Sequence, residues 1–215
     1  MKRRTFLSAA AMAVAGGALA NENQDAERGA AGTGCETIEE KPRRVPVIQD
    51  CDVCVLGGSC TGVFAAVRAA QLGAKVALVE KQNAFGGVAT LALVNMWHKL
   101  ISNKTKEQII GGLTRQMIEN LERIGAVGSH GNNYRLNTEE LKIELDRLVV
   151  EHEITPYLHT FYAAPQLDGG RVAAVFIENK NGRQAIRAKV FVDATGDGDL
   201  AKDADLPFEI RDGLQ

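Results

Sequence analysis

The stretch from residue 50 to 80 constrains the fold more than any other part of the chain. It reads DCDVCVLGGSCTGVFAAVRAAQLGAKVALVE, which predicts a strand over 52–56, a glycine turn, a helix over 63–72 and a second strand over 75–79. The first strand is short, apolar and rich in Val, as is typical of a strand buried on both faces of a parallel sheet. This order of elements predicts a βαβ nucleotide-binding unit.

The glycine turn fits a dinucleotide-binding fingerprint with one substitution. Gly57 allows a sharp turn out of the strand, and Gly62 allows the helix to pack close to the strand. Ser59 replaces the middle glycine, where a pyrophosphate approaches the backbone, and its hydroxyl could itself donate to a phosphate. Glu80 is placed to accept a hydrogen bond from a ribose 2′-OH, which favours a cofactor without a 2′-phosphate. The alternative is a unit of the same fold that serves only as scaffold.

The first 20 residues, MKRRTFLSAAAMAVAGGALA, are typical of an export signal. A basic head precedes a weakly apolar run over 6–19 that is too short to span a bilayer stably, and the run ends in a small-residue cleavage site. The pair Arg3-Arg4, followed by Phe6-Leu7, is similar to a twin-arginine signal. We therefore expect the twin-arginine export machinery as a partner, and a periplasmic or extracellular location without a stable membrane span after cleavage. An uncleaved anchor and a general secretory signal are the alternatives.

Residues 21–44 are polar and dotted with glycine, which predicts a disordered linker. The whole chain has 25 Lys and Arg against 27 Asp and Glu. Cleavage after residue 20 removes three cations and no acid, so the mature chain has a net charge near −5. This balance argues against nucleic acid as a partner.

The four cysteines invite a disulfide interpretation, which the spacing of Cys51 and Cys54 does not favour. On a strand, positions i and i+3 point to opposite faces, so the two sulfurs are expected to diverge instead of forming a redox pair or half a metal site. Cys54 is expected to be a small buried hydrophobic residue. The histidines show no metal spacing, and no metal site is predicted: His98, His130, His152 and His159.

Two helices are predicted in the middle of the chain, after the pair Gly86-Gly87. The pair permits close approach of a ligand to the backbone. Apolar spacing predicts an amphipathic helix over 108–124, with an alternative start after residues 111–112. Asn137 is a predicted N-cap, with Glu140 in the capping-box position, for a helix that runs to about residue 152.

The sequence pattern in the last third of the chain predicts several strands. Residues 155–162 read as a third parallel strand, and 171–178 with 184–188 read as a hairpin around an Asn-Gly turn. Residues 190–194 read as a further buried strand. The turn TGDGD over 195–199 follows it, at the strand end where ligands gather in open α/β sheets.

Together these pieces resemble the FAD-dependent oxidoreductases that have a two-dinucleotide-binding-domain fold, related broadly to fumarate reductases and glutathione reductase-like flavoproteins. Four matching stretches lie between residues 52 and 209: DVCVLGGSCTGVFAAVRAAQLGAKVALVEK, FGGVAT, IIGGL and VFVDATGDGDLAKDADLPFE. The resemblance implies an α/β fold with a Rossmann-like, FAD-binding parallel sheet and a β-hairpin crossover. It implies FAD as cofactor and hydride transfer from an unidentified small organic substrate to the flavin.

The resemblance also assigns cofactor-binding residues, while the catalytic residues stay unknown. The pyrophosphate would be held by the glycine turn: Gly57, Gly58, Ser59, Cys60, Thr61 and Gly62. Glu80 would bind the adenosine ribose, with Lys81 beside it. The ribityl and flavin end would meet the glycine pair and the residues after it: Gly86, Gly87, Val88, Ala89 and Thr90. The backbone near Tyr162 would meet the adenine, and the second turn would complete that side: Ala194, Thr195, Gly196 and Asp197.

Family members continue past the ATG turn into a substrate domain, which the sequence to Gln215 largely lacks. The expected organisation is a signal peptide over 1–20, a linker over 21–44 and an FAD-binding domain over 45–215 that is incomplete at its C-terminus. The chain is thus expected to be a fragment or a truncated gene product. Two alternatives to an oxidoreductase remain open: a truncated, non-catalytic nucleotide-binding module, and a thiazole-synthase-like nucleotide-binding enzyme.

Overall fold

The computed structural model describes residues 36–131 and 133–209 of the chain. The signal peptide predicted over 1–20 and the first part of the predicted linker lie outside these residues. Residues 36–44 form no helix or strand, and their side chains are exposed. The chain divides into two units, and the second, which begins at Arg44, holds every helix and strand described below. No helix within the described ranges is long and apolar enough to cross a membrane.

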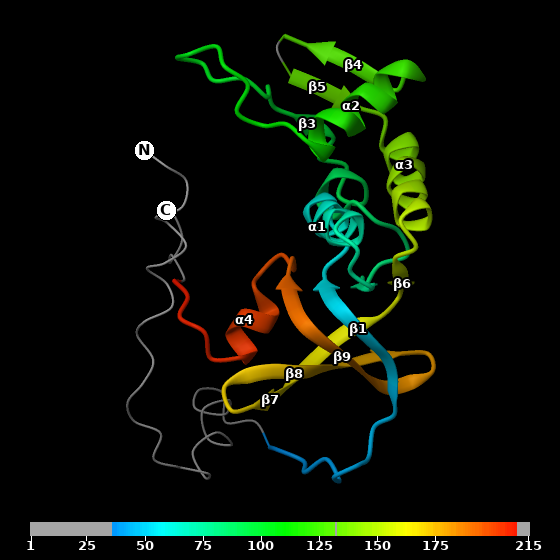
Figure 1. Cartoon of the computed structure of the whole chain (residues 1–215), viewed down its shortest axis with the longest axis vertical. Helices are drawn as coiled ribbons and strands as arrows, with labels where there is room; N and C mark the ends of the chain where they lie inside the picture. Colours follow the sequence, from blue (N-terminus) through cyan, green and yellow to red (C-terminus); the bar gives the residue numbers. More distant parts are fainter. Residues whose placement is uncertain (1–35, 132, 210–215) are drawn as a thin grey trace. The chain divides into compact units, whose positions relative to one another are not determined.

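A six-stranded sheet forms the centre of the second unit, with strand order β6-β2-β1-β9-β8-β7 (Figure 1). The strands, in sheet order, are Thr155–Tyr157, Val76–Val79, Val47–Leu56, Gly182–Asp193, Arg171–Asn179 and Phe161–Asp168. The first four are mutually parallel, and β8 and β7 continue the sheet in antiparallel register. The predicted α/β class with a parallel-dominated sheet is therefore confirmed.

Helices α1 (Cys60–Gln71) and α3 (Thr138–Glu151) contribute to the apolar core on one face of the sheet. Helix α1 buries Gly62, Val63, Ala66 and Val67, the spacing that places side chains on one face of a helix. All four residues of β2 are buried, because this strand lies inside the sheet and is covered on both faces.

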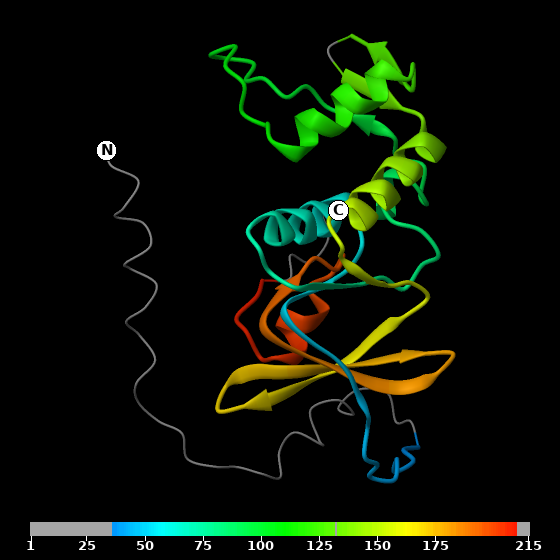
Figure 2. The ribbon, with the colours of Figure 1, turned by 45° about the vertical axis from the view of Figure 1, so that its right-hand side comes forward.

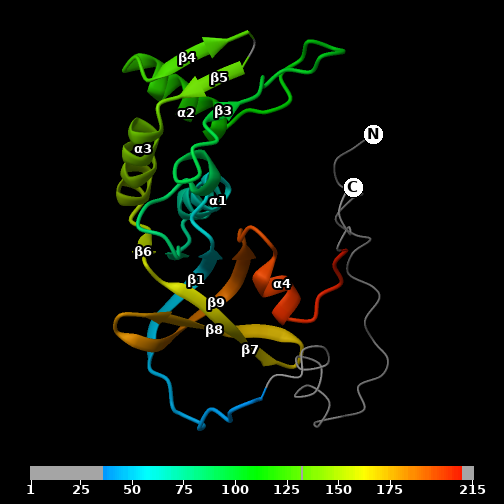
Figure 3. The ribbon, with the colours of Figure 1, turned by 180° about the vertical axis from the view of Figure 1, so that it is seen from behind.

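A second apolar cluster packs on the opposite face, where the short helix α4 (Asp199–Asp203) lies beside β9 and β7 (Figure 3). Leu200 of α4 joins Val175, Ile177 and Ile186 of the long antiparallel strands in this cluster. The chain continues from the end of β9 into α4, so this face also anchors the turn between them.

A small antiparallel sheet, which the sequence did not predict, contains β3 (Met96–Trp97), β5 (Asn133–Leu136) and β4 (Val127–His130). It lies with α2 (Leu113–Arg123) at the end of α3 away from the six-stranded sheet (Figure 2). Helix α2 begins after Gly112, so the shorter of the two predicted helices is confirmed. The buried Glu144 of α3 pairs with Arg147 and accepts a hydrogen bond from Asn120 of α2 at 3.3 Å, which ties the two helices together.

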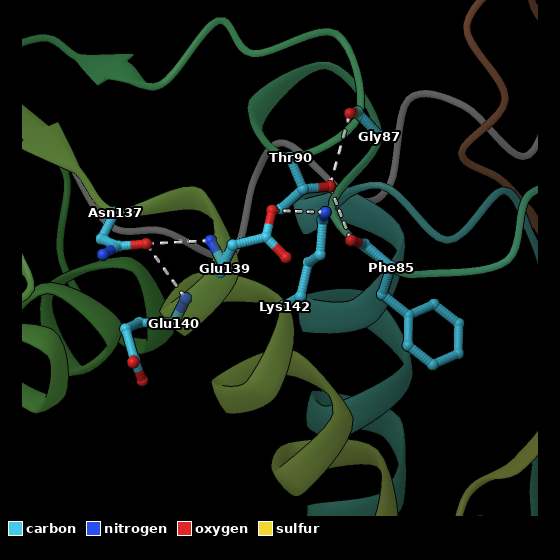
Figure 4. Close-up of polar contacts among 7 residues, drawn as sticks. All are labelled: Phe85, Gly87, Thr90, Asn137, Glu139, Glu140 and Lys142. Carbon is cyan, nitrogen blue, oxygen red and sulfur yellow. Dashed lines mark hydrogen bonds and ion pairs between the residues drawn. The ribbon is translucent and has the colours of Figure 1, made fainter.

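Helix α3 starts at the predicted N-cap, but the capping box is only half formed. The side-chain oxygen of Asn137 accepts hydrogen bonds from the N–H groups of Glu139 and Glu140 (Figure 4). The N–H of Asn137 donates instead to the carbonyl of Ala126 at 2.8 Å. The prediction that Glu140 completes the box is therefore wrong, because the carbonyl of Ala126, just before β4, already accepts from that donor.

Two strand predictions are corrected by the sheet. Residues 155–162 are not one parallel strand: β6 ends at Tyr157, and Phe161 begins β7, which is antiparallel to β8. Residues 184–188 and 190–194 are not separate strands either, since β9 runs without a break from Gly182 to Asp193. It pairs with β8 on one side and with β1 on the other, so the hairpin belongs to the main sheet.

Cys51 and Cys54 do not diverge as predicted. Both are buried in the same apolar cluster, and both are free thiols. The strand is irregular between them, because the N–H groups of Asp52 and Val53 both donate to the carbonyl of Lys75. This irregularity breaks the simple alternation of side chains. Cys54 has no exposed surface, which confirms its predicted role as a small buried hydrophobic residue.

Candidate functional site

A pocket of about 540 Å³ lies where the carboxyl ends of three parallel strands meet. Backbone hydrogen bonds hold these ends together. The N–H of Gly57, after β1, donates to the carbonyl of Val79 at 2.8 Å. The N–H of Ala194, after β9, donates to the carbonyl of Leu56 at the same distance. The pocket volume lies in the range of small-molecule sites in proteins, about 300 to 1,000 Å³.

Two glycines of the first turn are required by packing. Gly57 has φ +95°, and a Cβ atom there would lie 2.4 Å from the carbonyl oxygen of Ala194. A Cβ atom on Gly62 would lie 1.8 Å from the carbonyl oxygen of Gly57. Both distances are far shorter than any contact a real Cβ makes, so side chains at these positions would force the strand ends and α1 apart.

Ser59 occupies the middle position of the turn without backbone strain. It is the N-cap of α1, with φ −60° and ψ 171°, which any L-residue adopts. Its Oγ accepts a hydrogen bond from the N–H of Gly62 at 3.3 Å. The substitution of the fingerprint glycine therefore replaces a flexible residue with one that caps the helix.

Glu80 is buried at the pocket and holds two segments of the backbone. Its Oε2 accepts from the N–H of Gly58 at 2.7 Å, and its Oε1 accepts from the N–H of Gln82 at 2.8 Å. Each carboxylate oxygen keeps further acceptor capacity, because an ionised carboxylate offers about four lone-pair positions. The carboxylate is thus fixed in place and can still accept a hydroxyl.

The glycine pair after β2 is joined to the first turn. The N–H of Gly86 donates to the carbonyl of Gly58 at 2.8 Å, and Gly87 begins a short 3-10 turn, Gly87–Ala89. The hydroxyl of Thr90 donates to the carbonyl of Phe85 at 2.7 Å, inside the protein (Figure 4). Because Thr90 is fully buried, its hydroxyl is directed at the backbone of the loop and stabilises the shape of the loop.

The second turn is organised by the carboxylate of Asp193. Its Oδ1 accepts from the N–H of Thr195 at 3.0 Å and from the hydroxyl of Thr195 at 2.7 Å. Its Oδ2 accepts from the N–H of Ala201 in α4 at 3.0 Å. One side chain therefore fixes both the turn that lines the pocket and the helix that follows it.

Tyr162 brings an unsatisfied hydroxyl to the same region. This hydroxyl is buried, and no group in residues 36–131 or 133–209 meets it with hydrogen-bonding geometry. Burial raises the pKa of the phenol, and the nearby carboxylates of Asp203 and Asp193 raise it further, so the hydroxyl stays neutral and can donate.

The sequence from residue 52 to 213 matches the family described as FAD dependent oxidoreductase. The chain belongs to this family. FAD is the cofactor of the family, as the sequence predicted. The specific subfamily and the twin-arginine signal stay predictions.

Among curated proteins, the chain is similar to a dihydrolipoyl dehydrogenase of Trypanosoma brucei brucei, with 38% identity over an alignment of 80 residues that covers 33% of this chain and 17% of the relative. Among solved structures, it is similar to a geranylgeranyl bacteriochlorophyll reductase-like protein of Thermoplasma acidophilum (TM-score 0.54, 19% identity, 74% of this chain and 42% of the other). It is also similar to THI4 of Thermovibrio ammonificans (TM-score 0.52, 20% identity, 72% of this chain and 61% of the other). A third similar structure is that of the flavin-dependent brominase Bmp2 (TM-score 0.51, 17% identity, 72% of this chain and 40% of the other). The chain thus spans less than two thirds of each of these proteins.

The pocket fits the cofactor of this FAD-dependent family. Small residues line the pocket near the start of α1: Gly57, Ser59 and Gly87, and a Cβ atom on Gly87 would lie 3.3 Å from the Cβ atom of Ser59. The first turn of α1 contains no acidic residue, so no carboxylate opposes a pyrophosphate at the positive end of the helix dipole. Glu80 lies at the end of β2 with acceptor capacity for a ribose hydroxyl.

The structure brings eleven of the predicted cofactor-binding residues to the pocket wall. From the first turn and the end of β2 come Gly57, Ser59, Glu80 and Lys81. From the glycine pair and β7 come Gly87, Val88 and Tyr162. From the second turn come Ala194, Thr195, Gly196 and Asp197. The other predicted residues lie in the same loops outside the wall: Gly58, Cys60, Thr61, Gly62, Gly86, Ala89 and Thr90.

Several residues of the pocket wall were not predicted. They comprise Val79, Gln82, Leu91 and Ala92, and also Thr160, Phe161 and Asp199. Most lie within two positions of a predicted residue along the chain, so slightly longer segments around Glu80, Thr90 and Asp197 would have included them. Thr160 and Phe161 lie just before the predicted Tyr162, but the sequence placed them inside one parallel strand, whereas the structure divides that strand at this point.

Proposed function

We propose that this chain binds FAD in the pocket at the strand ends and is the FAD-binding part of an oxidoreductase that takes a hydride from a small organic substrate. The observation that carries the proposal is the convergence of both predicted turns and Glu80 on one pocket. The family match supports the cofactor. When bound, the flavin would supply the redox chemistry, and the protein would orient it.

The residue roles in this proposal follow from the positions of the side chains. The turn from Gly57 to Gly62 would hold the pyrophosphate at the N-terminus of α1. Glu80 would accept from the adenosine ribose, and the start of β7 near Tyr162 would meet the adenine. The loop from Gly86 to Thr90 would face the flavin end, with its shape maintained by the buried hydroxyl of Thr90.

Competition between ligands tests the proposal. FAD is titrated into the purified full chain while flavin fluorescence is measured, with ADP and FMN as competitors. ADP should compete at an affinity comparable to that of FAD, because Glu80 and both turns serve the adenosine and pyrophosphate half. FMN should compete weakly. Equal competition by FMN, or no binding of FAD and ADP at all, would reject this assignment of the pocket.

A thiazole-synthase-like enzyme remains the second candidate, and the resemblance of the fold to THI4 is the observation that keeps it. That resemblance, at 20% identity, establishes a shared fold. The two candidates differ in chemistry, so reduction of bound FAD by an organic donor, followed at the flavin absorbance band, supports the oxidoreductase. A non-catalytic nucleotide-binding module would bind FAD and show no reduction with any donor.

We further propose that the twin-arginine pathway exports the chain to the periplasm or the extracellular space. The basis is the sequence of residues 1–20, which lie outside the described part of the structure. Replacing Arg3 and Arg4 with Lys should leave the precursor in the cytoplasm, since both guanidinium groups would be read by the translocase. The measurement is cell fractionation with immunoblotting. Efficient export of the double variant would contradict the proposal.

A further inference from the structure

The chain between β3 and α2, residues 98–112, forms a hairpin that extends beyond the small antiparallel sheet (Figures 1 and 2). We call this segment the arm. Its two sides are joined by a bridge between Ile101 and Gln108, and the N–H of Ser102 donates to the carbonyl of Glu107 at 2.8 Å. At the tip, the side-chain oxygen of Ser102 accepts two further backbone hydrogen bonds at 3.2 Å. The arm therefore has a defined shape of its own.

Three isoleucines of the arm are exposed although the arm is folded. The side chains of Ile101, Ile109 and Ile110 keep 40%, 67% and 43% of their surface exposed. Leu100, by contrast, is buried. Its carbonyl accepts from the N–H of Ile109 at 2.9 Å and from that of Ile110 at 3.1 Å, so the base of the arm is anchored and the isoleucines are held in solvent. Neighbouring exposed apolar side chains on an ordered segment are typical of contact with a partner or a membrane.

The same arm carries positive charge. Lys99, Lys104 and Lys106 lie on it with a single acid, Glu107. None of the three lysines forms an ion pair within residues 36–131 and 133–209. Residues 98–136, from the arm through β5, have six Lys and Arg against three Glu, whereas the whole chain has 25 Lys and Arg against 27 Asp and Glu. Positive charge is thus concentrated in this region of a chain whose net charge is negative.

Lysines beside exposed isoleucines suit the surface of an anionic lipid bilayer. The ammonium groups attract the phosphates of the headgroups, while the apolar side chains enter the layer beneath them. The long stems of the lysines lie along that boundary. A nucleic acid would attract the lysines and leave the isoleucines in water. An acidic protein would need an apolar hollow shaped to a projecting arm, whereas a fluid bilayer needs none.

We propose that the arm docks the protein on the surface of a membrane that contains anionic phospholipid. The lysines supply an attraction that depends on the charge of the lipid, and the isoleucines supply a contact that depends on buried apolar area. Because the chain as a whole has a net negative charge, an anionic surface repels most of it and attracts the arm, which orients the protein. This docking requires no bound cofactor, so it is independent of the proposed binding of FAD.

Vesicle sedimentation tests the proposal on the full chain. The vesicles consist of phosphatidylglycerol mixed with phosphatidylcholine, or of phosphatidylcholine alone. Residues 1–20 are themselves basic and apolar, so Lys2, Arg3 and Arg4 are replaced by Gln in every sample, and this chain is the parent. The parent should bind the vesicles with phosphatidylglycerol at least about tenfold more tightly than the others, and added salt should reduce the difference.

Two paired variants separate the contributions of charge and apolar area. Lys104→Gln with Lys106→Gln should weaken binding to the anionic vesicles about 25-fold, since each lysine near such a surface contributes about fivefold. Ile109→Ser with Ile110→Ser should weaken the same binding at least about tenfold, because both side chains lose their apolar contact.

Each variant has a matched control elsewhere in the chain. Lys41→Gln with Lys180→Gln removes two exposed lysines outside the arm. Ile143→Ser with Val150→Ser removes two exposed apolar side chains from α3. Both controls should bind the anionic vesicles within about twofold of the parent. Circular dichroism establishes that every chain compared is folded.

Three results would overturn the proposal. No binding of the parent to any vesicle, or equal binding to both kinds, would exclude a membrane contact that depends on lipid charge. Equal losses in the arm variants and in their controls would show that the arm is not the contact. Binding to polyglutamate that the lysine variant loses, without binding to vesicles, would assign the arm to an acidic protein.

Discussion

Glu80 accepts a hydrogen bond from the backbone N–H of Gly58 at 2.7 Å, so the residue that ends β2 fixes the turn that ends β1. The same carboxylate accepts from the N–H of Gln82 on the other side. The residue predicted to bind a ribose is therefore also a structural part of the pocket. Its two roles can be separated experimentally.

Replacing Glu80 with Gln should lower the free energy of unfolding by about 2 kcal/mol, since an amide nitrogen would face one of the two buried N–H donors. Urea denaturation of the full chain, followed by circular dichroism, measures this change. Glu153→Gln is the control, because the side chain of Glu153 is exposed and forms no hydrogen bond with any residue that the structure describes. Equal stability of the two variants would contradict the structural role of Glu80.

The parent chain should bind ADP at least about tenfold more tightly than an ADP that carries a 2′-phosphate. The reason is that the Glu80 carboxylate accepts a 2′-hydroxyl and repels a phosphate in its place. Glu80→Gln should narrow this difference, because it removes the negative charge. Calorimetry at fixed salt measures both affinities, and tighter binding of the 2′-phosphorylated ligand by the parent would show the specificity assignment to be wrong.

Gly57→Ala should destabilise the chain by about 2–5 kcal/mol, because it combines a positive φ with a clash against the carbonyl of Ala194. Gly73→Ala isolates the first effect. Gly73 has φ +87°, yet a Cβ atom there would meet no atom within 4 Å, so about 1 kcal/mol is expected. Chemical denaturation gives both values. Similar costs for the two variants would mean that the strand ends can move apart freely.

Asp193→Asn should lower the free energy of unfolding by about 1–3 kcal/mol. Both carboxylate oxygens accept hydrogen bonds, and the substitution replaces one of them with an amide nitrogen, which only donates. The variant should also bind ADP more weakly, since the second turn lines the pocket. Asp168→Asn, at an exposed position, is the control for the loss of charge. A variant at Asp193 as stable as the control would show that this turn holds its shape without the carboxylate.

Burial raises the pKa of the Cys60 thiol to about 11, so this thiol should react slowly with iodoacetamide at about pH 8 in the folded chain. The folded state holds this proton to higher pH than the unfolded state. The thiol therefore contributes stability that is fully present below its ordinary pKa and is lost as the pH rises towards 11.

Two measurements check this expectation. Mass spectrometry of alkylated Cys60 should show a rate that rises steeply between about pH 8 and pH 11 and is far higher in urea. Cys60→Ala should weaken the decline of unfolding free energy over the same pH range. Rapid alkylation of the folded chain at about pH 8 would mean that the thiol is more accessible than the structure shows.

Local patterns predicted the first βαβ unit because its signals are short-range. Gly57, Gly62 and Glu80 lie on one strand-turn-helix-strand segment, where spacing along the chain nearly fixes position in space. The N-cap at Asn137 is equally local, since a side chain reaches only the next few N–H groups. These predictions depended on no distant partner.

The strand errors arose where pairing partners decide the structure. The sequence read 184–188 and 190–194 as separate strands, yet β9 is continuous because β1 supplies hydrogen bonds along most of its length. The alternation rule placed Cys51 and Cys54 on opposite faces, and the irregular pairing of Asp52 and Val53 with Lys75 placed both in one cluster. Neither β1, as the pairing partner of β9, nor Lys75, as the acceptor for Asp52 and Val53, can be read from the sequence next to the affected residues.

The sequence by itself determined the parallel βαβ unit, the cofactor class and most of the residues that line the pocket, because each is encoded in a contiguous motif. Only the tertiary structure decided that Glu80 holds Gly58, that Asp193 joins the second turn to α4, and that Thr160 and Phe161 reach the pocket. Such relationships depend on which strand ends become neighbours. Hydrogen bonding across the sheet sets those neighbours, and residues far apart in the chain supply it.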